Sequence, residues 1–190
     1  VDTSQLFCPG DKELFHRLYG MRHPAPQHVQ NFTYGWTQQN AQSVAEANLC
    51  ALPSPIACAL IAALEPLACA DIVHENIYAT LQLGHESQAQ YTAKDNMRAL
   101  SILDEPSLLQ SMTWLRQIGL RDVDLNLTTN LAPIANGLYA TLFVPLPKNL
   151  ALASVDGLYR EAYENSLFVR LLNQTPELKH VLDSKRIHLH

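Results

Sequence analysis

The sequence lacks any cluster of basic residues and any long apolar run. Its 190 residues carry a net charge of -5, and Lys and Arg are scattered, so no basic surface is expected for a phosphate backbone or an anionic lipid. No apolar run approaches the roughly 20 residues needed to cross a bilayer, and the first residues lack the pattern of a signal peptide. These absences argue against nucleic acid and membrane as partners and predict a cytoplasmic protein.

Glycine is also scarce. The seven glycines are scattered, and neither GxGxxG nor GxxxxGK[ST] occurs, so the chain is predicted to bind no dinucleotide by itself. His188 and His190 fall on one face of a predicted terminal strand, where two imidazoles could share a metal, but no third ligand is nearby in sequence. We therefore expect no metal site.

The four cysteines form no CxxC pair, and their apolar surroundings predict free thiols rather than disulfides. Cys50 lies on a predicted strand that leads into a Pro-Ser-Pro turn, and Cys58 lies in the first turn of the helix that follows. A helix N-terminus can lower the pKa of a thiol, so either cysteine could be a nucleophile. The alternative is that a small side chain is needed there against a tightly packed, Ala-rich helix.

The remaining patterns predict one α+β domain over residues 1–190. The segment 22–40 has no clean period and is expected to be irregular. Helices and strands alternate too irregularly for a doubly wound sheet, so we expect a mixed or antiparallel sheet with helices on one face. The predicted helices are Asp11–Tyr19, Ile56–Leu67, Pro106–Ile118 and Ser154–Asn165, and the predicted strands are Glu46–Leu52, Asp71–Leu83, Asp122–Thr128, Leu138–Leu146 and Leu167–Leu172.

Three blocks of sequence follow one another with specific spacing: EANLCALPSPIACALIAALEPL, LRDVDLNLTTNLAPIANGLYATLFVPL and VDGLYREAYENSLFVRLL. Together they resemble the C-terminal domain of the N-acetyl-gamma-glutamyl-phosphate reductase family, with aspartate-semialdehyde dehydrogenase as a more distant relative. The resemblance implies a fold like the C-terminal domains of glyceraldehyde-3-phosphate-dehydrogenase-type and semialdehyde-dehydrogenase-type enzymes. It also implies an N-terminal NADP-binding domain outside this chain, and the start at Val1 rather than Met agrees with an excised domain.

The resemblance implies the following reaction. A cysteine attacks an acyl phosphate, phosphate leaves, and NADPH reduces the resulting thioester, while a histidine acts as general acid and base. The matching positions here lack these groups. The nucleophile position holds Pro55, and the HRHxPE motif falls on Ile102–Ser107 without either histidine. Asn130 replaces the histidine of the TPHL turn, Asn136 replaces the arginine of the RG strand, and the Ser/Gly-rich loop near Leu81–Ser87 has lost most of its glycines.

These departures favour a catalytically silent relative of the reductase, kept for assembly, regulation or a changed ligand. One alternative is a divergent active reductase that uses Cys50 or Cys58, with Ser54, Asn130 and Asn136 as substrate-binding residues. Another is a pairing module with no small-molecule site. The resemblance further implies pairing of subunits through the sheet into a homodimer or homotetramer, and contact with the protein's own N-terminal domain.

Overall fold

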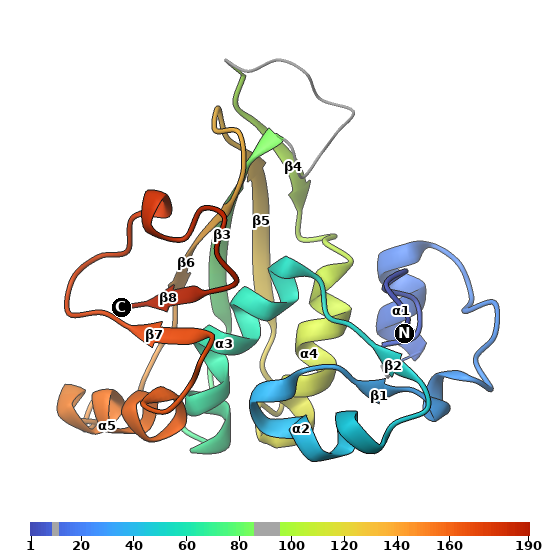
Figure 1. The fold of residues 1–190 in the computed structure, drawn as a ribbon, viewed down its shortest axis with the longest axis horizontal. Coiled ribbons are helices and arrows are strands. Elements are labelled where there is room, and N and C mark those ends of the chain that lie inside the picture. Colours follow the sequence, from blue (N-terminus) through green and yellow to red (C-terminus); the bar gives the residue numbers. More distant parts are fainter. Residues whose placement is uncertain (9–11, 86–95) are drawn as a thin grey trace.

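The computed structural model describes residues 1–8, 12–85 and 96–190, and Figure 1 shows their arrangement. Two short 3-10 helices, η1 (Val29–Asn31) and η3 (Leu178–His180), supplement the main elements. In chain order these are α1 (Lys12–Tyr19), β1 (Thr33–Tyr34), α2 (Thr37–Glu46), β2 (Cys50–Ala51), α3 (Pro55–Cys69), β3 (Ile77–Leu83), β4 (Arg98–Ile102), α4 (Ser107–Ile118), β5 (Leu125–Leu131), β6 (Leu138–Phe143), α5 (Leu152–Tyr163), β7 (Val169–Leu171) and β8 (Ile187–Leu189).

A four-stranded mixed sheet forms the centre of the fold, with the strand order β4-β5-β3-β6. Strand β3 pairs with β5 in parallel and with β6 antiparallel, and β4 pairs antiparallel with β5. Two small parallel pairs, β1-β2 and β7-β8, lie outside it. The predicted α+β class with a mixed sheet is confirmed.

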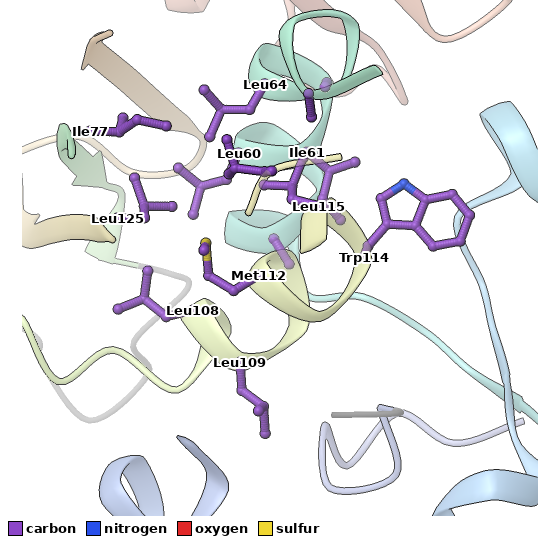
Figure 2. Close-up of a cluster of buried hydrophobic side chains, with 14 of the residues drawn as sticks. Leu60, Ile61, Leu64, Ile77, Leu108, Leu109, Met112, Trp114, Leu115 and Leu125 are labelled. Atoms are coloured by element: carbon purple, nitrogen blue, oxygen red, sulfur yellow. The ribbon is translucent and has the colours of Figure 1, made fainter. Parts of the chain in front are cut away.

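Helices α3 and α4 pack against each other and cover one face of this sheet, as predicted (Figure 1). Figure 2 shows leucines of both helices meeting side chains of β3 and β5 in the core. Leu60, Leu115 and Ile77 are fully buried. Each such side chain contributes about 1.5–3 kcal/mol relative to an exposed one, so this layer stabilises the fold and holds the start of α3 in place.

Helix α3 begins where local chemistry predicts. The Ser54 side chain accepts a hydrogen bond from the backbone N–H of Ala57, and Pro55 occupies the first helical position, where its missing N–H costs nothing. Pro66 lies in the last turn, so little of the helix follows the hydrogen bond that it removes. Although α3 is apolar it has only 15 residues, and none of the helices in the described ranges is long and apolar enough to cross a membrane.

The prediction differs from the structure most around residues 37–52. A strand was expected over Glu46–Leu52, but α2 ends at Glu46 and only Cys50–Ala51 is extended. The start of α2 also falls inside the segment 22–40, which was expected to be irregular. None of its ten residues is buried and Asn40 has non-helical backbone angles, so no apolar period marks this helix in the sequence. Strand β4 was not predicted either, and it carries no apolar alternation.

Candidate functional site

The candidate site is the junction at which β2 ends and α3 begins, which we call the elbow (residues 50–58). Its centre is Ser54, which is almost fully buried. The Ser54 hydroxyl donates a 2.9 Å hydrogen bond to Oγ of Ser107 while its oxygen accepts the N–H of Ala57 at 3.1 Å. One of the N–H groups that a helix N-terminus could offer to a ligand is therefore already used by the protein.

Side chains at the start of α4 complete this hydrogen-bond network. The Ser107 hydroxyl donates to Oε1 of Glu105 at 3.0 Å, and the backbone N–H of Ser54 donates to Oε1 of Gln110 at 2.6 Å. Sequence reasoning identified Glu105 and Ser107 only as replacements in the HRHxPE motif and did not single out Gln110. No local signal could have found this network, because its partners are 53 and 56 residues apart in sequence.

The two candidate thiols both lie at the elbow, and both are at least partly buried. Cys50 is buried on β2, and Cys58 is half-buried in the first turns of α3. Burial raises the pKa of the Cys58 thiol to about 11. At that pKa only about one thiol in ten thousand is ionised at pH 7, whereas a nucleophilic cysteine needs its pKa lowered.

No base lies within hydrogen-bond distance of either thiol in the part of the chain that the structure describes. Within the described residues, Cys50 Sγ has no hydrogen bond, and Cys58 Sγ contacts only the carbonyl oxygen of Pro53, at 3.9 Å. Pro55, which the resemblance places at the family's nucleophile position, offers neither a nucleophilic atom nor an N–H.

The three predicted substrate-binding residues do not converge. Ser54 is at the elbow, on the helix-covered side of the sheet. Asn130 alternates with buried neighbours along β5 and so points to the opposite face, where its amide donates to Oγ1 of Thr80 at 3.3 Å. Because the sheet separates Asn130 from the elbow, the two cannot contact one small ligand within this chain.

Asn136 lies in the connection between β5 and β6. Its side-chain oxygen accepts the N–H of Gly137 at 2.6 Å, and it lines a hollow of about 420 Å³ together with Leu178 and Asp183. This hollow shares no lining residue with the elbow. The other predicted loop, near Leu81–Ser87, can be followed only to His85, since residues 86 and 87 lie outside the described residues.

No group of three potential ligands suited to a metal ion occurs among the described His, Cys, Asp and Glu residues. His188 and His190, the pair considered from the sequence, alternate along the end of the chain. The Nδ1 atom of His190 lies 3.3 Å from the carbonyl oxygen of Leu172.

The second notable feature is the sheet face turned away from the helices, which we call the outer face. Strand alternation places nine side chains of β3, β5 and β6 on it, and none of them is charged. Tyr78 and Phe143 are direct cross-strand partners there and are 56% and 66% exposed. The nine residues are Tyr78, Thr80, Gln82, Asn126, Thr128, Asn130, Tyr139, Thr141 and Phe143.

Known proteins share this sequence pattern. Residues 56–190 match the family model described as semialdehyde dehydrogenase, dimerisation domain. The chain is 28% identical over 205 residues to an N-acetyl-gamma-glutamyl-phosphate reductase of Nitrosomonas eutropha, covering 100% of the chain and 58% of that protein. It is 25% identical over 193 residues to a reductase of the same name from Clostridium novyi, covering 97% and 56%. The chain thus spans little more than half the length of these relatives.

Solved structures share the fold. A probable aspartate-semialdehyde dehydrogenase from Pseudomonas aeruginosa superposes with a TM-score of 0.61 at 16% identity, over 82% of this chain and 56% of that one. The aspartate-semialdehyde dehydrogenase from Francisella tularensis gives a TM-score of 0.58 at 10% identity, over 84% and 60%. At these identities the likeness concerns the fold alone.

Proposed function

Since the chain belongs to the semialdehyde dehydrogenase dimerisation domain family, we propose that it is the subunit-pairing domain of an N-acetyl-gamma-glutamyl-phosphate reductase-like protein and that it does not reduce an acyl phosphate. An NADP-binding domain outside this chain would hold the nucleotide. All four cysteines are free thiols, which fits a protein of the reducing cytoplasm.

The elbow carries the proposal for catalytic silence. Hydride reduction of an acyl phosphate needs a thiolate to form the thioester. Here Pro55 stands at the matching position, the neighbouring thiol of Cys58 has its pKa raised by burial, and Ser54 is engaged with Ser107. A single loss could be compensated by a neighbouring group, but burial disfavours the thiolate of Cys58, and no base within hydrogen-bond distance of either thiol is found among the described residues.

The first prediction concerns activity. In the full-length protein, we expect NADPH oxidation dependent on N-acetylglutamyl phosphate to be on the order of a millionfold slower than in an active reductase, because the covalent nucleophile is absent. Spectrophotometry at 340 nm, with the Nitrosomonas eutropha reductase as positive control, measures this rate.

NADPH oxidation that depends on N-acetylglutamyl phosphate and lies well above background would contradict the proposal that the protein is catalytically silent. In that case Cys50→Ser and Cys58→Ser variants, compared with Cys69→Ser as a control at an exposed thiol, would show which cysteine has become the nucleophile. Loss of activity in one of the first two variants alone would establish the divergent reductase instead.

The outer face supports the pairing role. The centres of protein interfaces are depleted in charge and enriched in aromatic residues, and this face combines nine uncharged residues with two exposed aromatic rings. A twofold dimer brings the same surface patch of both subunits together, so the outer face of one subunit would meet the outer face of the other. We propose a homodimer, or a tetramer built from such dimers, that pairs through the outer face.

The second prediction concerns this pairing. Phe143→Glu should weaken self-association at least about tenfold, because a carboxylate on the outer face would be buried in the interface without a partner. Sedimentation velocity across a range of concentrations measures the change. Leu152→Glu is the matched control, since Leu152 is 82% exposed at the start of α5 and away from the outer face. A wild-type protein that stays monomeric at high concentration would contradict the pairing role.

A further inference from the structure

A pocket of about 370 Å³ lies between the N-terminal part of the chain and α4. Four segments of the chain line it: the first residues, α1, residues 23–30 and one side of α4. Helix α1 stands beside α4 in this region (Figure 1). A pocket of this volume is within the range of small-molecule sites.

The floor of the pocket is apolar. Leu14 and Phe15 of α1 and Leu109 of α4 are buried there, together with Cys8. Burial raises the pKa of the Cys8 thiol to about 12, so the thiol is uncharged at pH 7. The floor therefore suits the aliphatic or aromatic part of a ligand.

One wall of the pocket is held in place by contacts of His23. Its Nδ1 accepts the backbone N–H of Ala25 at 3.0 Å, so the neutral ring carries its proton on Nε2 and donates it to the carbonyl oxygen of Leu6 at 2.9 Å. The ring also lies against Phe7 and Phe15, at centroid distances of 5.2 and 4.8 Å. A wall that is already ordered lowers the entropy cost of binding a ligand.

The charged residues that line the pocket are both cationic. Lys12 is exposed at the rim, and Arg116 is half-buried on α4. Arg116 already has a contact within the chain, but a guanidinium carries five N–H donors and can bond to more than one group. The exposed amides of Gln30 and Gln117 add further donors, and no Asp or Glu is among the described residues of the lining. This rim is complementary to an anion.

We propose that the pocket binds a small carboxylate with an aliphatic or aromatic body. The body would lie on the floor of Leu14, Phe15 and Leu109. The carboxylate would accept charge-assisted hydrogen bonds from Lys12 and Arg116 at the rim. Both kinds of contact are needed, because an exposed ion pair alone contributes little. The proposal is independent of the proposed function, since no residue of the elbow or the outer face lines the pocket.

Titration of the full-length protein with phenylpropanoate, followed by NMR of leucine and valine methyl groups, tests the site. The methyl signals of Leu14, Val29 and Leu109 should shift, with a dissociation constant on the order of 1 mM. Phenylpropanol lacks the charge and acetate lacks the body, so each should bind at least about fivefold more weakly.

Three outcomes of these titrations would overturn the proposal. Equal binding of phenylpropanol would show that the pocket does not select an anion. Equal binding of acetate would show attraction to charge alone. Methyl signals that do not move with phenylpropanoate would show that the pocket takes no such ligand.

Three variants make the test specific. Lys12→Gln should weaken phenylpropanoate binding about threefold, the loss of one exposed charged contact, and should leave phenylpropanol binding unchanged. Lys185→Gln is the matched control, because Lys185 is also exposed but precedes β8, on the opposite side of the molecule from α1 (Figure 1). Thr113→Met extends a side chain of α4 into the pocket and should weaken binding at least about tenfold, with circular dichroism as the check on folding. Equal effects of the two lysine variants, or undiminished binding by folded Thr113→Met, would overturn the site.

Discussion

A Glu65→Leu variant should unfold with a free energy about 3 kcal/mol or more below that of the wild type. Glu65 is 1% exposed within α3, and its carboxylate accepts hydrogen bonds from three side chains. Trp36 Nε1 donates at 3.0 Å, Trp114 Nε1 at 2.9 Å and the Tyr163 hydroxyl at 3.2 Å. Leucine would leave three buried donors without an acceptor, at about 1–3 kcal/mol each. Urea unfolding monitored by circular dichroism measures the loss.

The Glu65→Gln variant is the control, since it keeps an acceptor oxygen but cannot ionise. Burial raises the pKa of Glu65 above its usual value of 4.5, although the three donors oppose this effect. A raised folded-state pKa means that folding favours the protonated acid. The stabilising contribution is therefore full below pH 4.5 and is lost as the pH rises through the folded-state pKa.

The unfolding free energy of the wild type minus that of Glu65→Gln should consequently fall across this pH range and then level off. Trp36 and Trp114 are the only tryptophans in the sequence, so tryptophan emission should titrate with the same midpoint. A difference that does not change with pH, together with emission that does not titrate, would show that Glu65 keeps its ordinary pKa.

Gly119→Ala should also be severely destabilising, by about 3 kcal/mol or more. Gly119 ends α4 with φ at +142°, a conformation that L residues rarely adopt. A Cβ added there would lie 2.1 Å from the backbone oxygen of Ala68, at the end of α3. Backbone atoms cannot swing aside as a flexible side chain can, so strain and overpacking would separate the two core helices.

Gly157→Ala is the matched control for that variant. Gly157 lies inside α5, and an added Cβ would meet no atom within 4 Å. Alanine should therefore stabilise the chain by about 0.5–1 kcal/mol, because it reduces the entropy of the unfolded state and favours the helix. Each variant differs from the wild type by one added methyl group. The difference between their unfolding free energies, measured by heat and by urea, therefore reports the cost of the methyl group at residue 119. Equal stability of the two variants would contradict the close approach of α3 and α4.

The elements that could be predicted are those with strong local signals. The apolar run after Pro55 predicts α3, and the period ending at Gly119 predicts α4. Strand β5 was placed with its start three residues early, because alternation alone does not mark where pairing begins. Helix α2 buries no residue, so its sequence has no apolar residues at helical spacing, and the apolar pattern could not predict it.

Some features of the elbow could likewise be predicted from the sequence, and others could not. Its turn and the Ser54 cap follow from residues within a few positions of one another, where proline geometry and capping act. The partners of Ser54 in α4 follow only from the packing of the two helices. The grouping of Ser54 with Asn130 was expected from the resemblance to the reductase family, but the alternation of β5 puts Asn130 on the other side of the sheet.

The sequence alone determined the family resemblance and the start of α3, because each depends on residue identity at positions linked by local chemistry. The tertiary structure decided which groups meet. Glu65 is joined to donors 29, 49 and 98 residues away, and Arg170 stands beside His188 through the register of two short strands. Such contacts depend on how helices pack and strands pair across the whole chain, and no local pattern encodes that.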